Sequence, residues 1–118
     1  MSCRFRLGQE TIWSPSAEAG RLYVAMTRCL AAGGGRPTGV KMIAEDIFDI
    51  DMEPFTDLVE VVYKEYFSSG DRVYRGQLHG WLLTSLVLLT RIGVTVNPSG
   101  DEERDLLLDV CEHAEEMP

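Results

Sequence analysis

The stretch from Gln77 to Gly93, QLHGWLLTSLVLLTRIG, constrains the fold most, because it is strongly apolar and contains no acidic side chain. Its only basic side chains are His79 and Arg91. The uncharged run is shorter than the roughly 20 residues that a bilayer-spanning helix needs. A helix that is apolar on nearly all sides must be covered by other elements. The stretch therefore predicts a buried central helix over residues 73–92, with Asp71 as its N-terminal cap.

Three further segments repeat apolar residues at the spacing of an amphipathic helix. The first runs from a cap at Ser14 to about Ala32. The second follows Pro54 and ends near Ser68, and the third opens at Ser99. On the first of these helices, the pattern predicts a core face made of Leu22, Met26, Cys29 and Leu30.

Strand patterns occur in two places. Residues 3–13 alternate apolar and polar side chains on both sides of Gly8, which predicts a β-hairpin that turns at Gly8 and Gln9. A further strand is predicted near Met42 to Met52, and it can join the hairpin to form a three-stranded sheet. The predicted fold class is therefore α+β, with an N-terminal hairpin packed on about four helices. A chain of 118 residues is expected to form a single domain.

The net charge of −8 is concentrated in residues 45–65 and residues 101–118, each of which carries −7. Such a surface repels nucleic acid and can attract a basic protein partner. The expected partner-binding residues are Asp49, Asp51, Glu53 and Asp57. The alternative is that these acids only form a solvated face, which is the more common role of a charge run.

A second interpretation makes some of these acids ligands of a hard cation, because Asp49, Asp51 and Glu53 alternate with apolar residues and would share one face of a strand. The spacing lacks the glycine turn and the distal glutamate of an EF-hand loop, so no metal site is predicted. The glycines at 33–35 follow a helix, whereas a phosphate-binding loop precedes one. No cofactor is predicted either.

The three cysteines, Cys3, Cys29 and Cys111, are odd in number and show no paired spacing. Together with the lack of a signal-peptide pattern, they predict reduced core thiols in a cytoplasmic protein. A reactive thiol is the alternative for Cys3, although only Arg4 lies near it in sequence to lower its pKa.

The residues best suited to bind a ligand surround His79, which lies within the most apolar stretch. A carboxylate from another element could tune this imidazole as a general base. Tyr63, Tyr66 and Trp81 could line a pocket with it, between the second helix and the central one. The alternative is that these are core residues, as aromatic side chains at helical spacing usually are. No catalytic motif of known spacing is present.

The segments FRLGQETIWSPSAEAGRLYVAM and LLTSLVLLTRIG, with the glycine-rich break between them, resemble a family of small uncharacterised actinobacterial proteins. The resemblance covers most of the chain and implies a compact cytoplasmic domain. It implies no activity and no functional residues.

Two functions follow from these patterns. The first is a non-catalytic protein-interaction or accessory module that docks a basic partner. The alternative is a small ligand-binding protein or enzyme of a biosynthetic pathway, with a pocket around His79. A homodimer that completes its core against a second copy is compatible with both.

Overall fold

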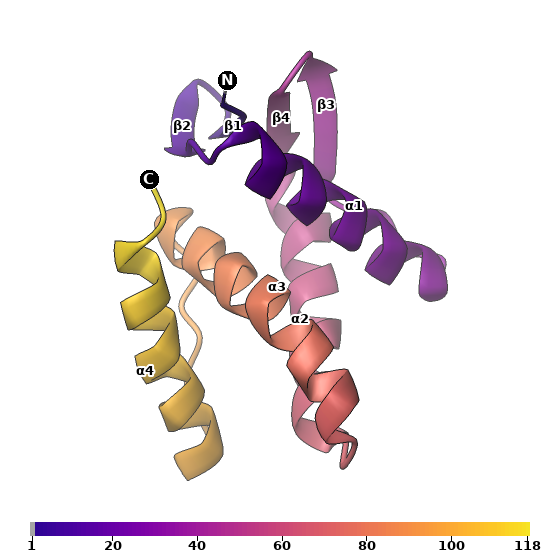
Figure 1. Ribbon diagram of the computed structural model, residues 1–118, viewed down its shortest axis with the longest axis vertical. Coiled ribbons are helices and arrows are strands. Elements are labelled where there is room, and N and C mark those ends of the chain that lie inside the picture. Colours follow the sequence, from indigo (N-terminus) through magenta and orange to yellow (C-terminus); the bar gives the residue numbers. More distant parts are fainter. Residues whose placement is uncertain (1) are drawn as a thin grey trace. The chain divides into compact units, whose positions relative to one another are not determined.

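The computed structural model describes residues 2–118. It is an α+β fold with four helices and a four-stranded mixed sheet (Figure 1). The elements in chain order are β1 (Arg4–Leu7), β2 (Glu10–Trp13), α1 (Ala17–Gly33), β3 (Val40–Ala44), β4 (Ile47–Ile50), α2 (Met52–Ser68), α3 (Arg72–Arg91) and α4 (Asp101–Glu115).

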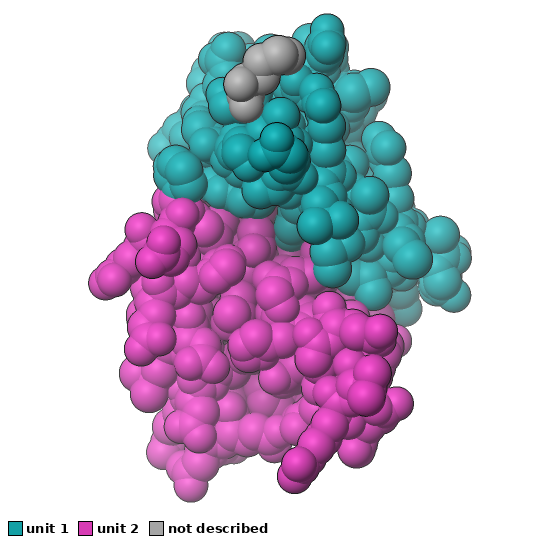
Figure 2. Space-filling view, viewed as in Figure 1, with its two compact units in different colours: residues 1–58, 118 teal, residues 59–117 magenta. Residues whose placement is uncertain are grey.

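The chain forms two compact units, shown in different colours in Figure 2. Unit 1 contains the residues up to Leu58, together with Pro118, and therefore includes the sheet, α1 and the start of α2. Unit 2 contains Val59–Met117, with the rest of α2, all of α3 and all of α4.

The sheet is built from two hairpins in the order β2-β1-β4-β3. The predicted hairpin of β1 and β2 is confirmed, with Leu7 opposite Glu10 across the turn at Gly8 and Gln9. The prediction of one further strand near Met42 to Met52 was wrong, because β3 and β4 form a second antiparallel hairpin in this region. The two hairpins join through a parallel pairing of β1 with β4.

The turn between β3 and β4 depends on Asp46, which has a φ of 59°. Its carboxylate accepts two hydrogen bonds from the guanidinium of Arg21, both 3.0 Å long. Its backbone carbonyl accepts a hydrogen bond from the backbone N–H of Arg4 at 2.8 Å. These contacts hold Asp46 in a left-handed conformation that aspartate tolerates better than most residues.

Helix α1 covers one face of the sheet and packs on an aromatic cluster (Figure 1). Phe5 lies between Trp13 and Phe48, with ring centroids 4.9 and 5.1 Å away, and Tyr23 of α1 meets Phe5 and Trp13 edge-on. Such aromatic pairs add stability beyond the area that they bury.

The predicted core face of α1 was wrong. The helix buries Gly20, Tyr23, Val24, Thr27 and Ala31 instead. Of the predicted face, Leu22 is 62% exposed, Cys29 is exposed, and Met26 and Leu30 are half-buried. The cap is Ser16 and not Ser14, because the Ser16 hydroxyl accepts a hydrogen bond from the N–H of Ala19.

Small side chains explain which face of α1 is buried. A Cβ placed on Gly20 would lie 2.7 Å from the Sγ of Cys3, the residue before β1, so only glycine lets the helix approach Cys3 this closely. The Thr27 hydroxyl is buried but donates to the carbonyl of Tyr23 at 2.7 Å, so its burial leaves no unpaired group.

In unit 2, α3 is the predicted buried helix. Every residue from Trp81 to Leu89 is buried, and the helix bounds agree with the prediction within one residue. The predicted cap is confirmed, since the Asp71 carboxylate accepts hydrogen bonds from the N–H groups of Val73 and Tyr74. No helix within residues 2–118 combines the length and apolar character that crossing a bilayer requires.

Helix α4 packs on α3 through a buried stripe that includes Leu106 and Val110. Its N-terminal cap is Gly100, which provides no side-chain hydrogen bond. The predicted opening of this helix at Ser99 is therefore wrong by one residue, and the Ser99 hydroxyl donates a hydrogen bond to the Glu103 carboxylate.

Candidate functional site

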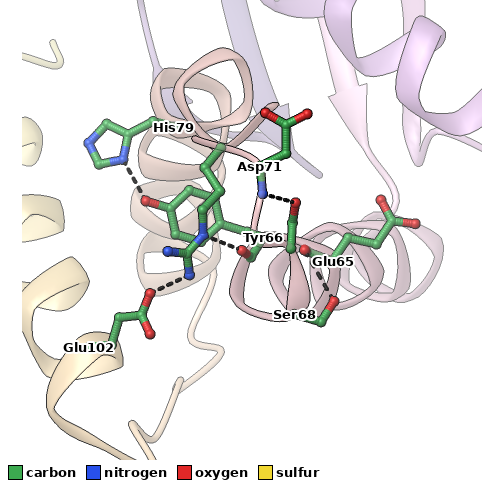
Figure 3. A network of polar contacts seen from close by, with 8 residues as sticks. Glu65, Tyr66, Ser68, Asp71, His79 and Glu102 are labelled. Carbon is green, nitrogen blue, oxygen red and sulfur yellow. Dashed lines mark hydrogen bonds and ion pairs between the residues drawn. The ribbon is translucent and has the colours of Figure 1, made fainter. Parts of the chain in front are cut away.

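Two of the four predicted ligand-binding residues meet directly in unit 2. A hydrogen bond of 3.1 Å joins the Tyr66 hydroxyl on α2 to Nδ1 of His79 on α3 (Figure 3). Tyr63 turns elsewhere and donates its hydroxyl to Glu103 on α4 at 2.5 Å. Trp81 is buried among the core residues of α3. The structure therefore pairs Tyr66 with His79 and gives Tyr63 a different polar partner.

Arg75 extends the Tyr66–His79 pair to the third helix of the unit. Its Nε donates to the backbone carbonyl of Tyr66 at 2.6 Å, and its guanidinium lies over the rings of Tyr66 and Phe67. The same guanidinium forms an ion pair with Glu102 on α4, which Figure 3 shows at the end of the network. Cation–π contacts and an ion pair together fix this side chain. Sequence reasoning missed Arg75 because its partners lie on other helices.

The second histidine, His113 on α4, also contacts α3. A hydrogen bond of 2.9 Å joins Nε2 of His113 on α4 to the Thr84 hydroxyl on α3. Burial lowers the pKa of His113, and the nearby His79 lowers it further, while Glu116 acts in the opposite direction. Within residues 2–118, no carboxylate hydrogen bonds to either imidazole. The geometry is that of polar links that fasten α3 to α2 and to α4.

Glu103 is a second polar link between helices. Burial, and then the hydrogen bond to Glu103, raises the pKa of Tyr63 well above its ordinary value. Hydrogen bonds from Ser99 and Tyr63 lower the pKa of Glu103. The tyrosine therefore stays protonated and the glutamate stays ionised near neutral pH, which is the strong, charge-assisted form of this bond.

A cavity of about 330 Å³ lies between α2, α3 and the segment that follows α3. Of the four predicted residues, Tyr63 lines this cavity. Its other lining residues are Val59, Glu60, Lys64, Leu86, Leu89, Val94, Thr95, Val96 and Asn97. His79 does not line this cavity, so a pocket around His79 stays a prediction from the sequence.

The four predicted partner-binding acids lie in unit 1 and differ in their surroundings. Asp49 on β4 is half-buried and faces Arg6 on β1, with Oδ1 and Nε 3.6 Å apart. This distance is too long for a hydrogen bond, so the two buried atoms form only an ion pair. Asp51, Glu53 and Asp57 are exposed, and none of them takes part in an ion pair within residues 2–118.

The strand-like alternation of these acids ends at Ile50, because α2 begins at Met52. Asp49, Asp51 and Glu53 therefore do not share one strand face, as the alternation had suggested. Across residues 2–118, no three His, Cys, Asp or Glu side chains are grouped closely enough to hold a metal ion.

The cysteines divide into one buried and two exposed thiols. Cys3 is fully buried, and its thiol lies 3.8 Å from Oδ1 of Asp46. Burial and then Asp46 raise the pKa of Cys3, which makes its thiol a poor nucleophile. The prediction of core thiols at Cys29 and Cys111 was wrong, because both are exposed.

These features define a small α+β protein in which polar links fasten three helices and exposed acids lie where the sheet leads into α2. The family model of unknown function DUF6086 matches residues 1–118, so the chain belongs to this family. The resemblance to a family of uncharacterised proteins is consistent with this membership. No curated protein and no solved structure matches the chain.

Proposed function

We propose that the chain is a non-catalytic interaction module that docks a basic protein partner through unit 1. The observation that carries this proposal lies where β4 leads into α2. Here the exposed acids Asp51, Glu53 and Asp57 lie within five residues of Met52, whose side chain is 42% exposed. We call these four residues the acidic junction. An exposed apolar side chain next to unpaired charges resembles the apolar centre and polar rim of a protein–protein interface.

The acids of the junction are free to meet basic side chains. Glu53 and Asp57 lie one turn apart on α2 and so share a face of the helix. Negative charge near a helix N-terminus also stabilises the helix, which gives Asp51 and Glu53 a purely structural role as the alternative. That role does not account for the exposure of Met52. Charges at such a rim chiefly speed the encounter with a partner of opposite charge.

Strand β3 continues this surface. The N–H of Asp51 donates to the carbonyl of Gly39 at 2.7 Å, which places the start of β3 beside the acidic junction. Further along β3, Met42 and Ile43 are 55% and 44% exposed. The module therefore offers apolar side chains on an open sheet edge next to negative charge, which suits a partner with both apolar and basic side chains.

The backbone of this edge is guarded against strand addition. The Thr38 hydroxyl donates to the carbonyl of Val40 and accepts from its N–H, so both backbone groups already have partners. A register shift between Met42 and Ala44 interrupts the ladder, and Lys41 places a charge on the edge. Irregular pairing and an edge lysine both discourage pairing with another strand. We therefore expect the partner to contact side chains here rather than extend the sheet.

The test is photo-crosslinking from Met52 in cells that express the protein, followed by identification and purification of the captured protein. Its affinity is then measured for the natural chain and for two variants. The junction variant is Asp51→Asn, Glu53→Gln and Asp57→Asn. The matched control removes three exposed acids of α4, through Asp105→Asn, Asp109→Asn and Glu112→Gln.

The junction variant is expected to bind about 3- to 150-fold more weakly, because three rim charges at roughly 0.2–1 kcal/mol each add to about 0.6–3 kcal/mol. The control is expected to retain most of the affinity, and added salt should weaken binding of the natural chain. Equal losses in the two variants, or binding that salt does not change, would reject the acidic junction as the docking surface.

The alternative function, a small ligand-binding protein or enzyme, is favoured by the cavity beside Tyr63 rather than by His79. A cytoplasmic location, the actinobacterial distribution of the family, the lack of nucleic-acid partners and a homodimer stay predictions from the sequence.

A further inference from the structure

The 330 Å³ cavity of unit 2 has the construction of a small-ligand site. Its floor is aliphatic and consists of Val59, Leu86 and Leu89, all of them buried. Pockets that bind small molecules usually span about 300–1,000 Å³ and are mainly apolar with a few polar groups. At the lower end of this range, the cavity suits a ligand with a short side chain.

Two unpaired charges of opposite sign stand at the α2 side of the cavity. Glu60 and Lys64 lie one turn apart, a spacing that predicts an ion pair between them. No ion pair found within residues 2–118 includes either residue, and both are exposed. Tyr63 lies between them in the lining, but its hydroxyl is already bound to Glu103, so it offers its ring to the cavity.

We propose that this cavity binds a small zwitterion with an apolar side chain, which is the chemistry of an aliphatic α-amino acid. Lys64 meets the carboxylate, Glu60 meets the ammonium group, and the side chain rests on Val59, Leu86 and Leu89. A ligand with a polar side chain is expected to bind more weakly, because the aliphatic floor provides no partner for the hydrogen-bonding groups of that side chain. This inference concerns unit 2 alone and does not depend on the docking of a partner by unit 1.

The outer wall of the cavity is the segment 94–97, which has room to move. Val94, Thr95 and Val96 also line a second cavity of about 230 Å³, so the segment has unfilled space on two sides. The backbone N–H of Val94 donates to the carbonyl of Leu89 at 2.9 Å and ties down the start of the segment. The remainder can shift outward to admit a side chain.

Titration of the ¹⁵N-labelled full chain, followed by NMR, tests the proposal with three probes of similar shape. L-Leucine carries both charges, 4-methylpentanoate lacks the amine, and 3-methylbutylamine lacks the carboxylate. Saturable shifts are expected at the amides of residues 59–64 and 94–97. Leucine is expected to bind about fivefold more tightly than either analogue, which is the upper range for one exposed ion pair.

Variants test whether Lys64 binds the carboxylate of the ligand and Glu60 its ammonium group. Lys64→Met is expected to make leucine bind no more tightly than 3-methylbutylamine, because the contact with the carboxylate is lost. Glu60→Gln is expected to make leucine bind no more tightly than 4-methylpentanoate, because the contact with the ammonium group is lost. Lys41→Met is the matched control, because Lys41 is the only other lysine of the chain and lies in unit 1. Val96→Trp is expected to fill the cavity and abolish the shifts, while the dispersed spectrum shows that the variant is folded.

The proposal is overturned if no probe gives saturable shifts at these amides. It is equally overturned if the three probes bind alike and Lys64→Met changes nothing, because the cavity would then select only apolar bulk.

Discussion

Replacing Gly39 with alanine is expected to destabilise unit 1 strongly. Gly39 has a φ of +71°, and a Cβ built there would lie 2.3 Å from the backbone nitrogen of Phe55 at the start of α2. The left-handed conformation costs an alanine roughly 1–2 kcal/mol. Forcing a methyl group against rigid backbone adds roughly 1–3 kcal/mol. The expected loss of about 2–5 kcal/mol is a large part of the roughly 5–15 kcal/mol that stabilises a typical domain.

Gly8→Ala is the matched control. Gly8 has a φ of +62°, but no atom lies within 4 Å of its virtual Cβ, so only the conformational cost of roughly 1–2 kcal/mol applies. The difference between the two variants therefore isolates the contact between Gly39 and the backbone of Phe55.

The assay is urea unfolding followed by tryptophan fluorescence. The chain has two tryptophans, Trp13 in unit 1 and Trp81 in unit 2, so a Trp81→Phe background reports on unit 1. If Gly39→Ala lowers the free energy of unfolding no more than Gly8→Ala does, the result would contradict the close approach of Gly39 to the backbone of Phe55. In a Trp13→Phe background, Trp81 reports on unit 2. If Gly39→Ala lowers the urea midpoint of unit 2 as much as that of unit 1, the result would support the prediction of a single cooperative domain.

Two further predictions concern titration and reactivity. The pKa of His113 is lower in the folded chain than in the unfolded chain, where it is about 6.5. At pH values between these two pKa values, the unfolded chain therefore binds more protons than the folded chain. Unit 2 is therefore expected to be fully stable above about pH 6.5 and to lose stability as the pH falls below it, and His113→Gln should flatten this dependence of the urea midpoint. A thiol reagent is expected to modify Cys29 and Cys111 rapidly and Cys3 only after unfolding; rapid labelling of all three thiols in the folded chain would contradict the burial of Cys3.

The sequence predicted the helices of unit 2 well, because the signals there are local. Asp71 caps α3 through N–H groups only two and three residues away. The nearly unbroken apolar run from Trp81 to Leu89 can only be buried, whatever surrounds it. Such features depend little on the rest of the chain.

The face of α1 could not be chosen from the sequence, because this helix is apolar on two sides. The pattern of large side chains favoured Leu22 and Met26, whereas the sheet selected the side with Gly20 and Ala31, where the helix can approach closely. Which side faces the sheet is decided by tertiary packing and not by hydrophobic periodicity.

The hairpin of β3 and β4 was missed because its turn lacks the usual residues. Glu45 and Asp46 replace the asparagine and glycine that commonly mark a two-residue turn. The left-handed Asp46 is held by Arg21, which lies on α1 and far away in sequence. A contact of this kind leaves no local signal.

The candidate site was predictable only where its residues lie close together in the sequence. The pairing of Tyr66 with His79 follows from two residues that face each other across the short turn between α2 and α3. The links from Arg75 to Glu102 and from Thr84 to His113 require α4 to be placed, which the sequence alone cannot do.

The strand order has a consequence for how the chain can be shortened. β1 begins at Arg4, yet it lies inside the sheet between β2 and β4. Removing the first seven residues would therefore not trim an edge. It would leave β2 without a neighbour, expose the side of β4, and reduce the four-stranded layer to an isolated β3–β4 ribbon, which is marginally stable on its own. Strand β1 therefore holds the two hairpins together in one sheet.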